Sequence, residues 1–178
     1  SDIDSVGFAE NSRVDYSQIY KEKYRLLRLA FEKSKKALGN TLAEFYEDHS
    51  WWLREFSVFM AIKDIQGGKA WSEWDEDLKN IGSHEVQEFE KKESDRINFW
   101  IFTQYFFLKQ WLKLKLYAND KGIKIIGDLP IYVSEDSSDL WANPKYFMLD
   151  DDLKPITVAG VPPDYFTAKG QLWGNPIY

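Results

Sequence analysis

The chain has 178 residues, no cysteine and a formal net charge of −6. The length suits one domain with a real core, the lack of cysteine excludes disulfides and thiolate metal sites, and the negative charge disfavours a nucleic-acid partner. No apolar stretch reaches the roughly 18 residues of a membrane span, and no signal-peptide pattern opens the sequence. We therefore expect no membrane partner and a cytoplasmic location.

Residues 1–121 are predicted to be mainly helical. Residues 16–38 repeat apolar side chains at helical spacing, and Gly39 followed by Asn40 predicts a helix stop. Thr41 and Glu44 form a capping-box pattern that predicts a new short helix. A third helix, "WWLREFSVFMAIKDIQ", is apolar on nearly all sides and is expected to be buried.

Two further helices are predicted before residue 121. Gly67 and Gly68 are expected to end the buried helix, and residues 83–92 have the pattern of an exposed acidic helix. Residues 95–120 predict a long, aromatic-rich helix, which Gly122 breaks.

The segment "IKIIG", at about 123–127, predicts a buried parallel strand, which makes the fold class α/β. Residues 128–178 are rich in proline and glycine and are predicted to be mostly loop. A loop of this length is too long for an ordinary connection between two elements. Ligands of α/β proteins bind at the carboxyl ends of parallel strands, where Asp128 stands. The sequence therefore predicts two parts: a helical part at 1–121, and a strand with a long active-site loop at 122–178.

One strand cannot satisfy its own backbone hydrogen bonds. Either its partners lie outside these 178 residues or further strands are hidden in the loop; we favour the first alternative. An unpaired strand also offers an edge for self-association with a second copy of the chain.

Aromatic residues make up 17% of the chain. Cores are generally dominated by aromatic side chains, so composition alone favours a structural role. Sugar-binding sites also need flat apolar faces, and Trp and Tyr add a polar edge for hydroxyl groups. Both interpretations stay open at this point.

Four motifs carry a resemblance to a known family: "GDLPIYV", "DSSDLWANP", "GVPPDYF" and "GQLWGNP", in that order. Together they resemble glycoside hydrolase family 77, the 4-α-glucanotransferases related to α-amylases. The resemblance implies a partial (β/α)8 barrel with a large helical insertion, and partners that are α-1,4-glucans and maltooligosaccharides. It also implies a retaining mechanism with two carboxyl groups about 5 Å apart and without any metal or organic cofactor.

The resemblance assigns roles to residues near the predicted strand. Asp128 matches an aspartate of the active-site floor; the alternative is a carboxylate that caps a turn. Tyr132 is expected to line the sugar site or to pack beneath the loop. Asp136, Asp139 and Trp141 are expected to hold the loop through hydrogen bonds.

The resemblance also assigns roles nearer the end of the chain. Tyr165 and Phe166, with Asp164 beside them, match a mobile aromatic loop that overhangs the active site; the alternative is an ordinary turn bounded by proline. Gln171 is expected to hydrogen-bond a sugar hydroxyl. Trp173 is expected to supply a stacking face, or else to be a core side chain.

Two metal interpretations are rejected. The acidic run at 150–152 lacks the alternating ligands and glycine of a calcium loop, so a solvated turn is expected. His49 and His84 have no spacing typical of zinc ligands.

The family's catalytic motif, an Arg-x-Asp strand followed by a Glu and a further Asp, is not found in a suitable place. Only Arg13-Val14-Asp15 fits its pattern, in a polar segment with no strand before it. We therefore expect an internal piece of a glucanotransferase that is inactive alone. The alternatives are a non-catalytic glucan-binding or structural module and, more distantly, a helical protein-binding adaptor formed by 16–120, which would not explain the loop.

Overall fold

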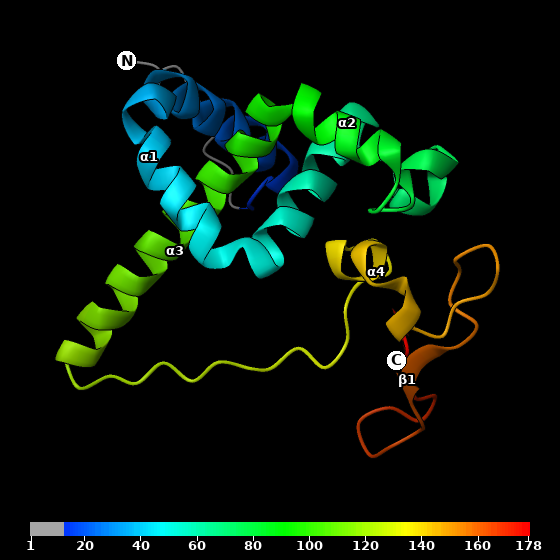
Figure 1. Cartoon of the computed structure of the whole chain (residues 1–178). Helices are drawn as coiled ribbons and strands as arrows, with labels where there is room; N and C mark the ends of the chain where they lie inside the picture. The colour runs from blue at the N-terminus through cyan, green and yellow to red at the C-terminus, as the bar shows by residue number, and fades with distance from the viewer. Residues whose placement is uncertain (1–12) are drawn as a thin grey trace.

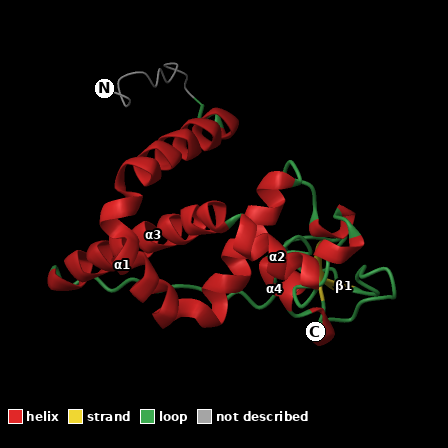
Figure 2. Ribbon diagram, turned by 45° about the horizontal axis from the view of Figure 1, so that its top comes forward, coloured by secondary structure: helices red, strands yellow, loops and turns green. Residues whose placement is uncertain are grey.

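A computed structural model describes residues 13–178. The described chain is mainly helical, with one small sheet near its C-terminal end (Figures 1 and 2). The elements in chain order are α1 (Tyr16–Ile65), the 3₁₀ turns η1 (Trp71–Glu73) and η2 (Glu76–Leu78), α2 (His84–Lys92), α3 (Ser94–Asp120), α4 (Ser138–Ala142), the 3₁₀ turn η3 (Pro144–Tyr146), β1 (Val158–Val161) and β2 (Gln171–Pro176).

Helix α1 is one continuous helix of 50 residues, which changes direction along its length (Figure 2). It begins at the N-cap Asp15, whose carboxylate accepts a hydrogen bond from the Gln18 backbone N–H at 3.0 Å. The predicted stop at Gly39 and the two separate helices after it are therefore wrong. The glycine signal is overridden because Phe31 and Leu42, on either side of it, are buried in the same core.

Replacing Gly39 by alanine is expected to stabilise the chain by about 0.5–1 kcal/mol. A Cβ added at Gly39 would have no atom within 4 Å outside its own helix, so alanine gains helix propensity without a clash. Urea denaturation followed by circular dichroism measures the change. A destabilised Gly39→Ala variant would mean that the helix does end at this glycine.

The other predicted helix boundaries are confirmed. The Gly68 backbone N–H donates to the Lys63 carbonyl at 2.8 Å and closes the end of α1 with a positive φ of 81°. The Ser83 hydroxyl caps α2 by accepting from the Val86 N–H at 3.1 Å. Gly122, with a φ of 77°, follows the end of α3.

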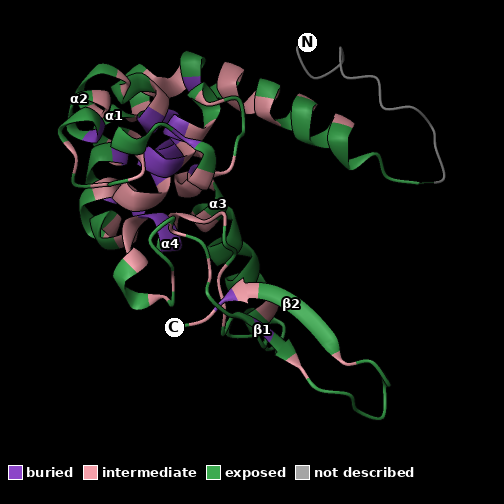
Figure 3. Ribbon diagram, turned by 90° about the vertical axis from the view of Figure 1, so that its right-hand side faces the viewer, coloured by how far each residue is buried: buried purple, intermediate pink, exposed green. Residues whose placement is uncertain are grey.

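The core lies between α1 and the N-terminal half of α3, where buried residues concentrate (Figure 3). The Phe31 ring meets the rings of Phe99 and Phe102 edge-on, at centroid distances of 5.8 and 5.4 Å. Arg28 places its guanidinium 3.5 Å from the centroid of Phe99. Much of the aromatic content therefore serves packing, as the structural interpretation predicted.

The C-terminal half of α3 carries exposed apolar side chains, among them Phe107, Leu116 and Tyr117. Lys109, Lys113 and Lys115 lie among them in the sequence. Among the helices of residues 13–178, none has an apolar stretch of the length that a bilayer crossing requires.

The short helix α4 anchors the C-terminal part of the chain to the helices. Trp141 is fully buried, and its Nε1–H donates to the Leu78 carbonyl at 2.8 Å. Its ring also lies 5.8 Å from Phe59 and 6.0 Å from Trp74, between centroids. The expected structural role of Trp141 is confirmed. Asp139 differs from the prediction, because its carboxylate forms no hydrogen bond within the described residues.

Residues 123–127 do not form the predicted buried strand. The segment runs as an extended, exposed trace between α3 and α4 (Figure 1), and Ile126 is 93% exposed. A parallel strand needs hydrogen-bonded neighbours, and no segment of residues 13–178 pairs with this one. The described residues therefore contain no closed barrel.

Two antiparallel strands, β1 and β2, replace part of the predicted loop. Gly160 pairs with Leu172 and Val161 with Gln171, and the register shifts between Val158 and Gly160. A Cβ at Gly160 would lie 2.7 Å from the Gln171 carbonyl oxygen. Glycine thus permits the close approach of the strands, and the hairpin projects away from the helices (Figure 3).

Candidate functional site

Three of the predicted site residues come together beside the hairpin. Gln171 and Trp173 are two residues apart on β2, which places both side chains on one face of the strand. The Trp173 Nε1–H donates to the Gln171 Oε1 at 3.0 Å, and the Tyr132 ring meets the Trp173 ring at a centroid distance of 6.2 Å. Trp173 remains 45% exposed. We call Tyr132, Gln171 and Trp173 the aromatic platform.

Two further aromatic residues extend this platform. Tyr178 stacks on Tyr132, with ring centroids 6.4 Å apart and an interplanar angle of 15°, and Phe147 lies 5.0 Å from Tyr178. Beside them is a hollow of about 510 Å³, lined by Val133, Asp139, Asn143, Tyr146, Phe147 and Tyr178. Sequence reasoning missed Phe147 and Tyr178, because only the general excess of aromatic residues pointed to them.

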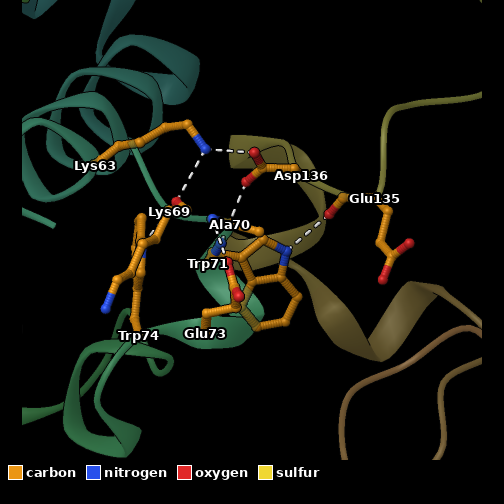
Figure 4. A network of polar contacts seen from close by, with 8 residues as sticks. All are labelled: Lys63, Lys69, Ala70, Trp71, Glu73, Trp74, Glu135 and Asp136. Atoms are coloured by element: carbon orange, nitrogen blue, oxygen red, sulfur yellow. Dashed lines mark hydrogen bonds and ion pairs between the residues drawn. The ribbon is translucent and has the colours of Figure 1, made fainter. Parts of the chain in front are cut away.

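The loop that carries Tyr132 is attached on both sides. The Asn175 side-chain amide of β2 donates to the Val133 carbonyl at 2.8 Å. On the helical side, the Trp71 Nε1–H donates to the Glu135 carbonyl at 2.8 Å, and Asp136 pairs with Lys63 (Figure 4). The predicted role of Asp136 in holding the loop is confirmed.

A second hollow, of about 410 Å³, opens between residues 70–72, the loop at 134–136 and residues 173–175 of β2. It is lined by Ala70, Trp71, Ser72, Ser134, Glu135, Asp136, Trp173, Gly174 and Asn175. The side chains of Ser72, Ser134 and Glu135 have no hydrogen-bond or ion-pair partner within residues 13–178. A polyhydroxylic ligand on Trp173 would therefore meet polar groups that are not already engaged.

The tip of the hairpin presents two aromatic rings to solvent. Tyr165 is 98% exposed and Phe166 90%, and their rings meet edge-on at 5.7 Å. The Asp164 carboxylate accepts hydrogen bonds from the N–H groups of Phe166 at 2.9 Å and Thr167 at 2.8 Å. Asp164 thus shapes the turn that presents the two rings.

Gly170 closes this turn with a φ of 69°, and a Cβ there would lie 2.4 Å from the Val161 carbonyl oxygen. Only glycine fits at this position. The tip therefore owes its shape to glycine and to Asp164 rather than to packing.

Asp128 is not brought to the platform. It lies in the exposed extended segment, and its carboxylate forms no hydrogen bond or ion pair within the described residues. The structure thus unites Tyr132, Gln171 and Trp173, while Asp128 and the Asp164–Tyr165–Phe166 turn stand apart from them.

The acidic run at 150–152 forms a solvated turn, as predicted. The Asp150 carboxylate accepts from the backbone N–H groups of Asp152 at 3.0 Å and Lys154 at 2.9 Å. Among residues 13–178, no group of three or more His, Asp or Glu side chains is arranged to hold a metal ion.

A larger cavity, of about 650 Å³, lies within the helical part, between α1 and the start of α3. Its lining includes Phe31, Leu42, Tyr46, Arg54, Glu90 and Ile97. It shares no residue with the sequence-predicted site, so size alone does not make it the functional site.

Comparisons with known proteins give a consistent result. The sequence model of glycoside hydrolase family 77, described as 4-alpha-glucanotransferase, matches residues 3–178. A 4-alpha-glucanotransferase of Aquifex aeolicus is 47% identical over 92% of this chain and 33% of its own length. One from Clostridium butyricum is 42% identical over 99% of this chain and 37% of its own length.

A solved structure agrees with the sequence relatives. An amylomaltase from Streptococcus agalactiae in complex with acarbose is 41% identical and covers 100% of this chain and 37% of its own, with a TM-score of 0.89. The resemblance read from the four motifs is confirmed. The chain spans about a third of the length of the curated relatives that it matches.

Proposed function

This chain belongs to glycoside hydrolase family 77, and we propose that it forms a substrate-binding part of a 4-α-glucanotransferase. The proposed enzyme transfers α-1,4-glucan segments between maltooligosaccharides. In a retaining double displacement, a carboxylate forms a glycosyl-enzyme while a carboxylic acid protonates the departing oxygen. The 4-hydroxyl of an acceptor sugar then attacks and releases the carboxylate.

The observation that carries the proposal is the aromatic platform. Trp173 is half-exposed yet fixed from two sides, by its hydrogen bond to Gln171 and by the ring of Tyr132. A fixed, flat indole is suited to stack against the C–H face of a glucosyl ring. The Gln171 amide stands at its edge, within reach of a sugar hydroxyl.

The exposed rings of Tyr165 and Phe166 are proposed to cover the bound glucan. Such a cover excludes water from the glycosyl-enzyme, which lets an acceptor sugar compete with hydrolysis. Asp164 supports this role by holding the turn.

Asp128 is proposed to belong to the active-site floor, and residues 123–127 to be a barrel strand. The unpaired backbone of this segment supports pairing with neighbouring strands of a longer protein. In the isolated chain, the unpaired backbone groups of residues 123–127 favour self-association with a second copy.

The isolated chain is expected to bind maltoheptaose with a Kd of about 1 mM and to show no turnover. Turnover is not expected because the Arg-x-Asp strand and the following Glu are not found among its 178 residues. Calorimetric titration measures binding, and glucose release from maltotriose measures disproportionation. No saturable heat would overturn the binding proposal, and glucose above background would overturn the expected inactivity.

The activity of the whole gene product distinguishes the enzyme from the non-catalytic module. The protein that the whole gene encodes is expected to convert maltotriose into glucose and longer maltodextrins. Glucan binding without that conversion would favour the non-catalytic module.

A further inference from the structure

The end of α1 is tied to the loop that carries Tyr132. The Lys63 Nζ pairs with the Asp136 Oδ2 and also donates to the Lys69 carbonyl at 3.1 Å (Figure 4). Lys63 is largely buried and Asp136 partly so. Each charge also makes a second hydrogen bond to a backbone group, and these charge-assisted bonds fix the geometry of both side chains.

Backbone and indole groups complete this attachment. The Asp136 Oδ1 accepts from the Trp71 backbone N–H at 3.2 Å, while the Trp71 Nε1–H donates to the carbonyl of Glu135. Trp71 is itself fully buried among the helices. Residues 135–136 are therefore fixed to a rigid part of the molecule, more than 60 positions earlier in the chain.

The attachment lies next to the aromatic platform. Tyr132, whose ring contacts Trp173, precedes Asp136 by four residues, and Val133 between them accepts the Asn175 hydrogen bond from β2. The loop is thus held at one end by Lys63 and Trp71 and at the other by the hairpin. Freeing the Lys63 end leaves the Tyr132 ring with fewer restraints against Trp173.

We propose that Lys63 and Asp136 are positioning residues, which hold Tyr132 against Trp173 and thereby set the affinity of the platform for α-1,4-glucan. Neither side chain belongs to the platform. Asp136 also lines the hollow beside Trp173, whereas Lys63 does not, so the Lys63 variants report the effect that is transmitted through the loop. The choice of ligand rests on the proposed function, whereas the positioning of the two rings does not.

The test compares Lys63→Met, Asp136→Asn and Lys63→Arg in the full chain. Lys63→Met keeps the apolar stem and loses the charge, and Asp136→Asn keeps one carbonyl oxygen for the Trp71 N–H. Both are expected to weaken maltoheptaose binding about fivefold, measured by calorimetric titration. Lys63→Arg restores the pair and is expected to stay within about twofold of the parent chain.

A matched control is Lys35→Met, which breaks the exposed contacts of Lys35 with Asp95 at 2.7 Å and Glu32 at 2.8 Å. It is expected to leave maltoheptaose affinity unchanged. Melting temperatures of all variants, followed by circular dichroism, separate a loss of stability from a loss of affinity.

A second readout needs no ligand. Nuclear Overhauser contacts between the Tyr132 and Trp173 rings are expected in the parent chain and in Lys63→Arg, and to be lost in Lys63→Met. If the ring contacts and the affinity survive in Lys63→Met and Asp136→Asn while the melting temperature falls, the pair is only structural and the inference is wrong. If the parent chain binds no maltoheptaose, the proposed function fails. The contacts between the Tyr132 and Trp173 rings in the parent chain and the variants then test on their own whether Lys63 and Asp136 position Tyr132.

Discussion

Replacing Trp173 by alanine is expected to weaken maltoheptaose binding by about tenfold or more. The substitution removes the stacking face, the contact with Tyr132 and the group that orients Gln171. An aromatic contact contributes about 0.5–1.5 kcal/mol beyond the buried apolar area, and about 1.4 kcal/mol corresponds to a factor of ten in Kd. Calorimetric titration measures the change.

The matched control is Trp51→Ala. Trp51 is 79% exposed on α1 and has no part in the platform. Its removal is expected to leave the Kd unchanged. Equal affinities for the parent chain and Trp173→Ala would show that glucan binds somewhere other than the platform.

Replacing Trp141 by alanine is expected to lower the free energy of unfolding by about 3–5 kcal/mol. The side chain is fully buried, fills the space between Phe59 and Trp74, and donates to the Leu78 carbonyl. Alanine leaves a cavity and an unpaired carbonyl. Urea denaturation followed by circular dichroism gives the difference.

Trp141→Phe helps to separate the two contributions, because it loses the N–H donor but leaves a smaller cavity than alanine does. We expect it to cost about 1–3 kcal/mol, less than the alanine variant. A loss below about 1 kcal/mol for Trp141→Ala would contradict the view that α4 anchors the C-terminal part to the helices.

Local signals predicted the helix ends well where tertiary packing agreed with them. Ser83 and Gly68 act as a cap and a terminator because their side-chain and backbone groups satisfy free ends of the helices. Gly39 gave the same signal and was wrong, because the helix on both sides of it packs into one core. A preference of about 1 kcal/mol for ending at glycine is too small to oppose that packing.

The strands were harder to predict, because strand formation depends on distant partners. The apolar run at 123–127 has the composition of a strand, yet nothing in residues 13–178 pairs with it. The opposite error concerns β1 and β2, because Gly160 within β1 and Gly170 just before β2 are typical of loops. In the structure these glycines permit close backbone contacts within the hairpin.

The sequence predicted the site residues within each segment, but not the contacts between segments. The alternation of Gln171 and Trp173 along one strand follows from the sequence once the strand is known. The attachment of the loop to Trp71 and Lys63 joins residues more than 60 positions apart, and no local pattern reveals it. Tyr178 and Phe147 were missed because their ring contacts also join separate segments of the chain.

The most direct test of the account follows the indole N–H signals of the eight tryptophans by nuclear magnetic resonance during a maltoheptaose titration. We predict that the Trp173 signal shifts most and saturates, while the signals of Trp51 on α1 and Trp111 on α3, which are also exposed, stay in place. A Trp173 signal that does not move, or larger shifts at Trp51 or Trp111, would contradict the claim that the aromatic platform binds the glucan.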